Sequence, residues 1–295
     1  MLSTDAFIQY LQYERNYSLG TIEGYQADIL ELQDFIESRV GDLAPGEVDA
    51  DLIREWVMAL MARGLAATTV CRKLSSVRSY YKFLLKRGEV ASDPMQRVTA
   101  PKKKKPLPVF LKESEMDRLL DEVPFDEGFV GTRDHAILAT LYATGMRVSE
   151  LVGLDDGSVD FAASVIRVTG KRNKQRLIPF TDELHRELRQ YLQARQNEVP
   201  HRQEPALFVR TNGQRLSRQI VARIVKRDLS KVTTVRKRSP HVIRHTFATA
   251  MLNHDAQLGA IKELLGHESL ATTQVYTHTT FEELKKVYNQ AHPRA

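Results

Sequence analysis

Cysteine is almost absent from this sequence. Cys71 is the only one, so no disulfide can form within the chain, and a reducing compartment suits it. No apolar run is long enough to span a bilayer. The first ten residues, MLSTDAFIQY, lack the basic start and apolar stretch of a secretory signal. We therefore expect a cytoplasmic protein with no membrane association.

The remaining composition is that of a globular protein with a real core. Hydrophobic residues make up 42% of the 295 residues and charged residues 27%. The formal net charge is +6 and the pI is about 9.3, which modestly favours a polyanionic partner. The first hundred residues hold slightly more acid than base, so the positive excess lies in the later part of the chain.

Residues 3–90 have the apolar periodicity of helices throughout. The clearest stripe predicts a helix that begins near Thr68, and its members are Val70, Leu74, Val77, Tyr81 and Leu84. This block ends at Asp93-Pro94, and a run of prolines and lysines follows at 101–108. We expect a helical domain at 1–100, a basic linker at 101–109 and a second domain at 110–295.

The second domain is predicted to be mostly helical with a small antiparallel sheet. Two strands, 165–168 and 176–179, form a hairpin around Lys171. The cations of that hairpin, Lys171, Arg172, Lys174 and Arg176, are typical of exposed charge. Helices are expected at 114–123, 135–144, 182–196, 217–228, 240–253, 257–265, 270–276 and 281–290. The fold class is therefore mainly α, an N-terminal helical bundle followed by a mostly helical domain with a small sheet.

The segment 241–276 carries the chemistry. His241 and Arg244 are three apart, so on a helix they share one face. Gly266 is a natural helix stop, His267 follows it, and Tyr276 stands nine positions further on. A phenol can attack a phosphodiester without a metal if guanidinium and imidazolium groups stabilise the added negative charge. A phosphotyrosyl ester keeps the energy of the broken bond, so a strand can be rejoined without ATP.

These motifs in this order resemble the tyrosine recombinase (phage integrase) family. Besides H-x-x-R, LGH and the tyrosine, the blocks ATGMRVSEL, GKRNKQRLIP and FEELKKVYNQAHPRA are similar to those of Xer-type chromosome-dimer recombinases. The resemblance covers nearly the whole chain. It implies a SAM-like core-binding domain that clamps DNA, a catalytic domain, a 3′-phosphotyrosyl intermediate, a Holliday junction, and no cofactor.

The resemblance also implies a role for each matching residue. Tyr276 would be the nucleophile, and Glu150, three residues from one phosphate-binding arginine, could hold its guanidinium in position. Lys171 matches the family's general-acid lysine, although the family usually has a small residue where Arg172 stands, which leaves Lys174 as a weaker candidate. The remaining members of the set are the arginines Arg147 and Arg244, His241 as proton acceptor for the phenol, and His267 as donor to a phosphate oxygen.

Double-stranded DNA is the expected partner. Phosphate contacts are predicted for two groups of cations, the helical stripe Arg78, Lys82 and Lys86 and the linker run Lys102, Lys103, Lys104 and Lys105. The family implies a homo- or hetero-tetramer on DNA, a possible paralogue, a possible septal DNA translocase, and association with the nucleoid. The final helix has an apolar face, with Phe281, Leu284, Val287 and Tyr288. A tail is not expected to bury this face on itself, so the helix is expected to dock on a neighbouring protomer.

Four alternatives stay open at this point. A zinc hydrolase is suggested by His241 and His245, which are four apart, but Val242 occupies the position of the general base in H-E-x-x-H. A DNA-binding protein without catalysis and a type IB topoisomerase both share part of the pattern. An integrase or resolvase of a mobile element shares all of it. His245 and His278 are expected to be structural.

Overall fold

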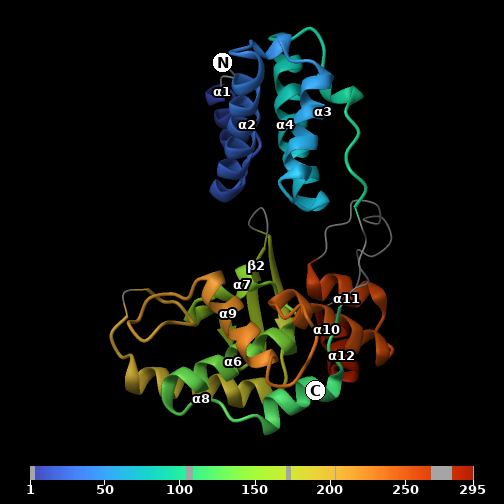
Figure 1. Ribbon diagram of the computed structural model, residues 1–295. Helices are drawn as coiled ribbons and strands as arrows, with labels where there is room; N and C mark the ends of the chain where they lie inside the picture. The colour runs from blue at the N-terminus through green and yellow to red at the C-terminus, as the bar shows by residue number, and fades with distance from the viewer. Residues whose placement is uncertain (1–3, 104–108, 171–173, 203, 267–280, 295) are drawn as a thin grey trace. The chain divides into compact units, whose positions relative to one another are not determined.

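The computed structural model describes residues 4–103, 109–170, 174–202, 204–266 and 281–294. The chain forms two compact units, Met1–Pro106 and Leu107–Ala295, which are shown in Figure 1. The fold is mostly helical with one three-stranded antiparallel sheet, so the predicted fold class is confirmed. Within the described ranges, no helix has both the length and the apolar character needed to cross a membrane.

The N-terminal unit is a helical bundle. Its elements are α1 (Asp5–Gln9), which continues as a π-helical turn (Tyr10–Glu14), α2 (Leu19–Val40), α3 (Ala50–Ala62), α4 (Ala67–Arg87), and the 3-10 turns Pro45–Glu47 and Pro94–Arg97. All five residues of the predicted α4 stripe are buried. Each helix packs its apolar side against the other helices of the unit. The helical period of 3.6 residues therefore predicts which residues form the core.

One buried charge ties α2 to α4. Asp28 on α2 is 1% exposed and accepts hydrogen bonds from Arg72 (2.6 and 2.9 Å), Lys73 (2.9 Å) and Ser76 (2.7 Å). A buried carboxylate is tolerated only when its charge and its lone pairs are satisfied, and these donors do both. The ion pairs of α4 thus use Arg72, Lys73 and Arg87.

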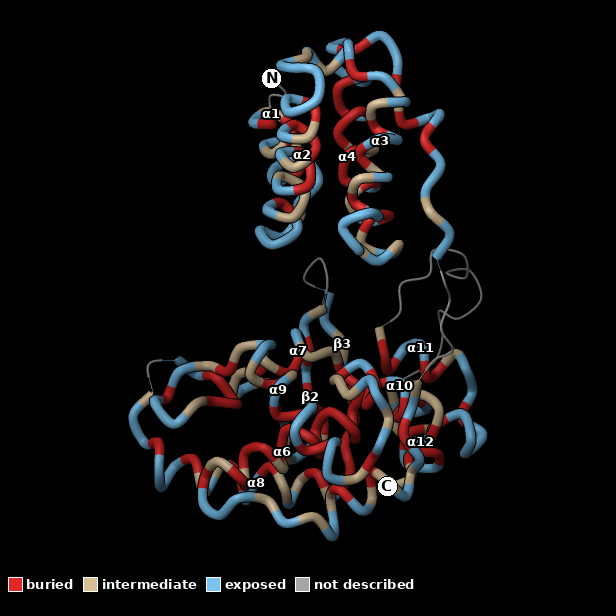
Figure 2. Tube along the Cα trace, in the orientation of Figure 1, coloured by how far each residue is buried: buried red, intermediate tan, exposed pale blue. Residues whose placement is uncertain are grey.

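The C-terminal unit packs its helices around α6 (Gly128–Thr144), which is buried along most of its length (Figure 2). The other elements of this unit are α5 (Glu113–Asp117) with a π-helical turn (Arg118–Glu122), α7 (Val148–Val152), a 3-10 turn (Asp156–Ser158), β1 (Val159–Asp160), β2 (Val165–Thr169), β3 (Gln175–Pro179), α8 (Asp182–Glu198), α9 (Arg218–Leu229), α10 (Pro240–Asn253), α11 (Leu258–Leu265) and α12 (Phe281–Ala291).

The predicted hairpin is present. β2 pairs with β3 in antiparallel register, with Ile166 opposite Ile178, and both side chains are fully buried. β1 pairs with the other edge of β2 and was not predicted, because two residues give no readable alternation. The tip of the hairpin, 171–173, lies outside the described residues.

Helix α6 begins seven residues earlier than the predicted start at His135. Its first two turns contain Gly128 and Gly131, which read as loop residues in the sequence. Close packing explains Gly131, since a Cβ there would lie 1.7 Å from the backbone oxygen of Asp126. Tertiary contacts therefore override the local helix propensity here.

Helix α12 packs on its own unit, so the expectation that a tail could not bury this face on itself is wrong. Leu284 and Tyr288 are 4% and 0% exposed, and the Tyr288 hydroxyl donates to the backbone oxygen of Ala143 (2.9 Å). Arg294 then holds the end of the chain through what we call the tail cluster. Its guanidinium donates to three carboxylates, those of Asp117 (3.1 Å), Asp121 (2.6 and 2.9 Å) and Glu183 (2.9 Å).

Candidate active site

The first candidate arginine stands immediately before α7. Arg147 is the N-cap residue of that helix and Glu150 lies in its first turn. One oxygen of Glu150 accepts from the Arg147 backbone N–H (2.7 Å), and the other accepts from its guanidinium (3.0 Å). Glu150 is 4% exposed, so its charge is fixed in a buried position. The helix start therefore holds both the backbone and the side chain of Arg147.

The second candidate arginine lies in the first half of α10. Arg244 is buried and donates to two backbone oxygens, those of Gly145 (2.7 Å) and Leu265 (2.7 Å). Gly145 ends α6 at a φ of +57°, and a Cβ at this position would lie 2.4 Å from the Phe247 ring. Glycine at 145 thus provides both the helix stop and the space for the Phe247 ring, while its carbonyl accepts from Arg244.

Arg147 and Arg244 meet at the C-terminal end of α11. Arg147 donates to the backbone oxygen of Gly266 (3.0 Å), and Arg244 donates to that of Leu265. These two carbonyls are consecutive, and His267 follows them directly. The structure therefore brings together three segments that are separated in sequence, the ends of α6 and α11 and the first turns of α10.

A third arginine, Arg176, joins Arg147 and Arg244. The sequence pattern indicates exposed hairpin charge at this position. The Arg176 side chain on β3 is only 16% exposed. Its guanidinium donates to both oxygens of Glu150 (2.8 and 2.9 Å) and to the backbone oxygen of Leu264 (2.8 Å). The bonds of Arg176 reach 26 and 88 residues along the chain, which no local pattern could indicate. We call Arg147, Arg176, Arg244 and Glu150 the guanidinium cluster.

The guanidinium cluster has a surplus of positive charge. Its described residues contribute three guanidiniums and one carboxylate, which together have a net charge of +2. Burial, followed by the positive charge of Arg147, lowers the pKa of Arg244 to about 10. The pKa of Glu150 is lowered despite its burial because the hydrogen bonds from Arg176 and Arg147 favour the ionised form. Such a cluster stabilises an anion that arrives between its members.

His241 stands on the same face of α10 as Arg244, one turn nearer the N-terminus. Partial desolvation lowers its pKa below the usual 6.5, and the charges of Arg244, Lys237 and Arg147 lower it further. The imidazole is therefore neutral at pH 7 and able to accept a proton. In the described part of the chain, no group of three or more His, Cys, Asp and Glu side chains is arranged to hold a metal ion.

Several predicted site residues lie outside the described residues. They are Lys171, His267, Tyr276 and the linker lysines Lys104 and Lys105, together with the helix predicted at 270–276. The other predicted DNA contacts lie in the N-terminal unit, where Arg78 is half-buried and Lys82, Lys86, Lys102 and Lys103 are exposed.

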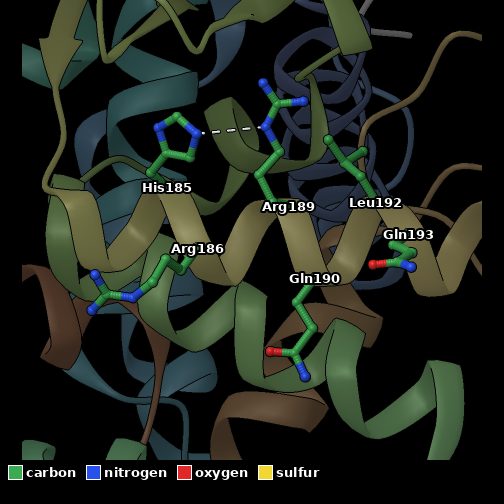
Figure 3. A pocket seen from close by; sticks show the side chains of 6 residues that line it. All are labelled: His185, Arg186, Arg189, Gln190, Leu192 and Gln193. Carbon is green, nitrogen blue, oxygen red and sulfur yellow. Dashed lines mark hydrogen bonds between the residues drawn. The ribbon is translucent and has the colours of Figure 1, made fainter.

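A shallow hollow on α8 is a separate feature. His185, Arg186, Arg189 and Gln193 are among the residues that line it, and no predicted site residue does. Figure 3 shows the imidazole of His185 and the guanidinium of Arg189 extending from the same side of α8. Both groups pack on Phe161, with the Arg189 guanidinium 4.1 Å from the ring centre. These side chains are thus used in packing between α8 and the segment after β1.

The comparisons with known proteins agree on the family. The model of the phage integrase family matches residues 109–283, and the model of the phage integrase N-terminal SAM-like domain matches residues 4–88. The tyrosine recombinase XerC of Pelotomaculum thermopropionicum is 42% identical over 99% of this chain and 98% of its own length. The XerC of Mycobacterium sp. is 38% identical, again over 99% and 98%.

Solved structures share the fold. The XerH recombinase in its post-cleavage complex with difH DNA has a TM-score of 0.72 at 21% identity, covering 96% of this chain and 83% of that one. The Tn1549 transposon integrase in complex with circular intermediate DNA has the same TM-score at 21% identity, covering 94% and 96%. The chain therefore belongs to the phage integrase family and is a tyrosine-type, site-specific DNA recombinase.

Proposed function

We propose that the chain cleaves each DNA strand by attack of the Tyr276 hydroxyl on the scissile phosphorus. The bond from phosphorus to the 5′-oxygen breaks, which leaves a 3′-phosphotyrosyl ester and a free 5′-hydroxyl. Attack by the 5′-hydroxyl of a second strand reverses the step and rejoins the DNA. The two esters have similar energy, so the exchange needs no ATP.

The charge surplus of the guanidinium cluster is the observation that carries this proposal. A phosphodiester brings one negative charge, and its pentavalent transition state has one more. The net +2 of Arg147, Arg176, Arg244 and Glu150 balances that transition state. Arg147 and Arg244 donate to the consecutive carbonyls of Gly266 and Leu265, which come directly before His267 in the sequence, and Tyr276 follows nine residues later.

The other catalytic roles follow from charge and from the family pattern. His241, which is neutral at pH 7, accepts the proton of the Tyr276 hydroxyl. Lys171 donates a proton to the departing 5′-oxygen. The position of Gly170, which precedes Lys171 in the sequence, supports this role, since a Cβ at Gly170 would lie 3.6 Å from the Glu150 carboxylate. His267 donates to a phosphate oxygen.

Both units hold the duplex in this proposal. The domain 1–100 uses the stripe Arg78, Lys82 and Lys86 on α4. The linker 101–109 adds Lys102, Lys103, Lys104 and Lys105, and the domain 110–295 cleaves. Such contacts release counterions, so affinity falls by about a thousandfold between 50 and 200 mM salt for six or more phosphate contacts. A flat salt response would contradict this extended contact.

The biological role we propose is the resolution of chromosome dimers before cell division. The support is the similarity to curated XerC recombinases along almost the whole chain. In this role four protomers, with or without a paralogue, join two sites through a Holliday junction in the nucleoid, under the control of a septal DNA translocase. Strand exchange between two copies of the host terminus site, with purified protein alone and with a paralogue, tests it.

Covalent trapping tests the chemistry. A duplex with the recombination site and a nick near the scissile phosphate loses its short fragment after cleavage, so the protein stays attached. We expect an adduct that survives detergent with the wild type and none with Tyr276→Phe, at unchanged DNA affinity. An adduct with Tyr276→Phe would assign the nucleophile elsewhere, and no adduct with the wild type would refute the mechanism.

A further inference from the structure

Glu150 is saturated by its two arginine neighbours. One of its oxygens accepts from the guanidiniums of Arg176 (2.8 Å) and Arg147 (3.0 Å). The other accepts from Arg176 (2.9 Å) and from the Arg147 backbone (2.7 Å). Arg176 supplies the two-pronged contact, and the Arg147 side chain supplies a single bond. The stronger and more directional ion pair of this carboxylate is therefore the one with Arg176.

This division of contacts leaves most of Arg147 available to a ligand. The Arg147 side chain is 32% exposed, twice as much as that of Arg176 at 16%. A carboxylate that is 4% exposed needs a positive partner, because an unpaired buried charge is costly. If Arg176 were absent, Arg147 would be the remaining guanidinium of the cluster in contact with Glu150, and its charge would be neutralised there.

Arg176 also fixes the end of α11. Its Nε donates to the backbone oxygen of Leu264, one residue before the carbonyl that Arg244 contacts. The fit at Gly266 is tight, since a Cβ there would lie 2.9 Å from Nη1 of Arg176. One side chain on β3 thus links the base of the hairpin, the start of α7 and the end of α11.

We propose that Arg176 is a positioning residue for strand cleavage: it neutralises Glu150 and so keeps the Arg147 guanidinium for the scissile phosphate. Arg176 does not touch the DNA in this role and acts through Glu150. The inference rests on the proposed function, because it assigns the phosphate to Arg147. It adds a requirement to that function, namely that the cluster must keep its net charge of +2.

Charge arithmetic gives the test. Arg176→Met leaves two arginines and one carboxylate, a net charge of +1. The double variant Arg176→Met with Glu150→Gln has two arginines and no carboxylate, which restores +2. The measurement is the single-turnover rate of covalent adduct formation on the nicked duplex, together with the DNA affinity and the urea unfolding curve of each variant.

We expect Arg176→Met to cleave about 10- to 100-fold more slowly, the size of effect seen when a residue that orients a metal ligand is removed. The second substitution should restore about tenfold or more of the lost rate, as for two residues coupled in one network. DNA affinity should be unchanged throughout. A purely structural role for Arg176 predicts the opposite, that the double variant is as slow as the single one or slower.

A matched control is available in the same unit. Arg195 is buried, pairs with Asp156 (2.7 Å) and donates to the backbone oxygens of Ala206 (3.2 Å) and Leu207 (2.6 Å). Arg195→Met removes a similar set of bonds, while Arg202 still pairs with Asp156 (2.8 Å). The folded fraction of this control should cleave at the wild-type rate. Where Arg176→Met lowers the folded fraction, Arg176→Gln removes the same charge and keeps a donor for Leu264.

The outcomes separate the two proposals. Cleavage by Arg176→Met at the wild-type rate, or no recovery in the double variant, overturns the role of Arg176 and leaves the proposed function in place. No adduct with the wild-type protein overturns both. Slow cleavage by the single variant and recovery in the double variant support the positioning role.

Discussion

Two arginine clusters of the C-terminal unit, the guanidinium cluster and the tail cluster, have opposite charge balance. In the guanidinium cluster, Arg147 and Arg176 pair with the single carboxylate of Glu150, and Arg244 adds a third positive charge. In the tail cluster, Arg294 alone serves the carboxylates of Asp117, Asp121 and Glu183. The same two kinds of side chain are used in both places, but the guanidinium cluster has positive charge to spare, whereas the tail cluster does not.

The pKa values show what the difference means. Burial and the charge of Arg147 lower the pKa of Arg244 to about 10, which means that its surroundings disfavour the charged form of the guanidinium. The pKa of Arg294 is raised, first by its hydrogen bonds to Asp121, and that of Asp121 is lowered. A cluster that stabilises its own charges fixes structure. A cluster with an unbalanced positive charge is prepared for an anionic ligand.

The largest effect is expected at Arg244. Arg244→Met removes a preplaced donor from the transition state, which costs about a hundred- to a thousandfold in the rate of cleavage. Single-turnover adduct formation on the nicked duplex measures it. Amide exchange in α12 should stay at the wild-type rate, because the tail cluster is not altered. A rate within a few-fold of the wild type would remove Arg244 from the site.

Acid should loosen the chain end through His292, which lies next to Arg294 and is 5% exposed. Burial lowers its pKa to about 4 from 6.5, so the unfolded chain binds the proton more readily between these values. Stability is complete above pH 6.5 and falls as the pH drops towards 4, by about 2 kcal/mol between pH 7 and pH 5. Urea unfolding of the wild type and of His292→Phe measures the difference, and equal losses in the two proteins would contradict it.

Arg294→Met should lower the free energy of unfolding by about 1 to 2 kcal/mol, because the carboxylates of the tail cluster are partly exposed and screened by solvent. The loss should be local, so amide exchange in α12 should accelerate well before that in α6. Arg244→Met provides the contrast, since it should leave exchange in α12 unchanged. Unchanged exchange in Arg294→Met would show that the tail cluster does not hold the helix.

The smallest effect is expected at Asp117. Its carboxylate is half exposed and shares Arg294 with two others, so Asp117→Asn should change stability by about 0.5 kcal/mol or less. Urea unfolding measures this change. If Asp117→Asn lowered the free energy of unfolding as much as Arg294→Met, the other two carboxylates would not be able to replace Asp117 as partners of Arg294.

Much of the fold could be predicted from the sequence because its signals are local. The stripe of α4 has the helical period, and the two strands of the hairpin are short adjacent segments joined by a turn. The contact between Arg147 and Glu150 follows from a spacing of three residues at a helix start. In each case the interacting groups lie within a few residues of one another or in neighbouring elements.

What could not be predicted depends on distant contacts. Arg176 stands among exposed cations in sequence, and only the folded chain brings Glu150 and Leu264 to it. The tail helix packs on α10, α11 and β3, and its Tyr288 hydroxyl reaches the Ala143 carbonyl on α6, 145 residues earlier. A one-dimensional pattern shows that a face must be covered, but it does not show what covers it.

The most direct test of the charge surplus compares two scissile groups. A methylphosphonate replaces one non-bridging oxygen with a methyl group, so the phosphorus centre has one negative charge fewer at each stage. If the guanidinium cluster stabilises that charge, Arg244→Met loses a hundred- to a thousandfold on the normal phosphodiester but only about tenfold or less on the methylphosphonate, relative to the wild type. An equal loss on both substrates would contradict the claim that the surplus of arginine is there for the phosphate.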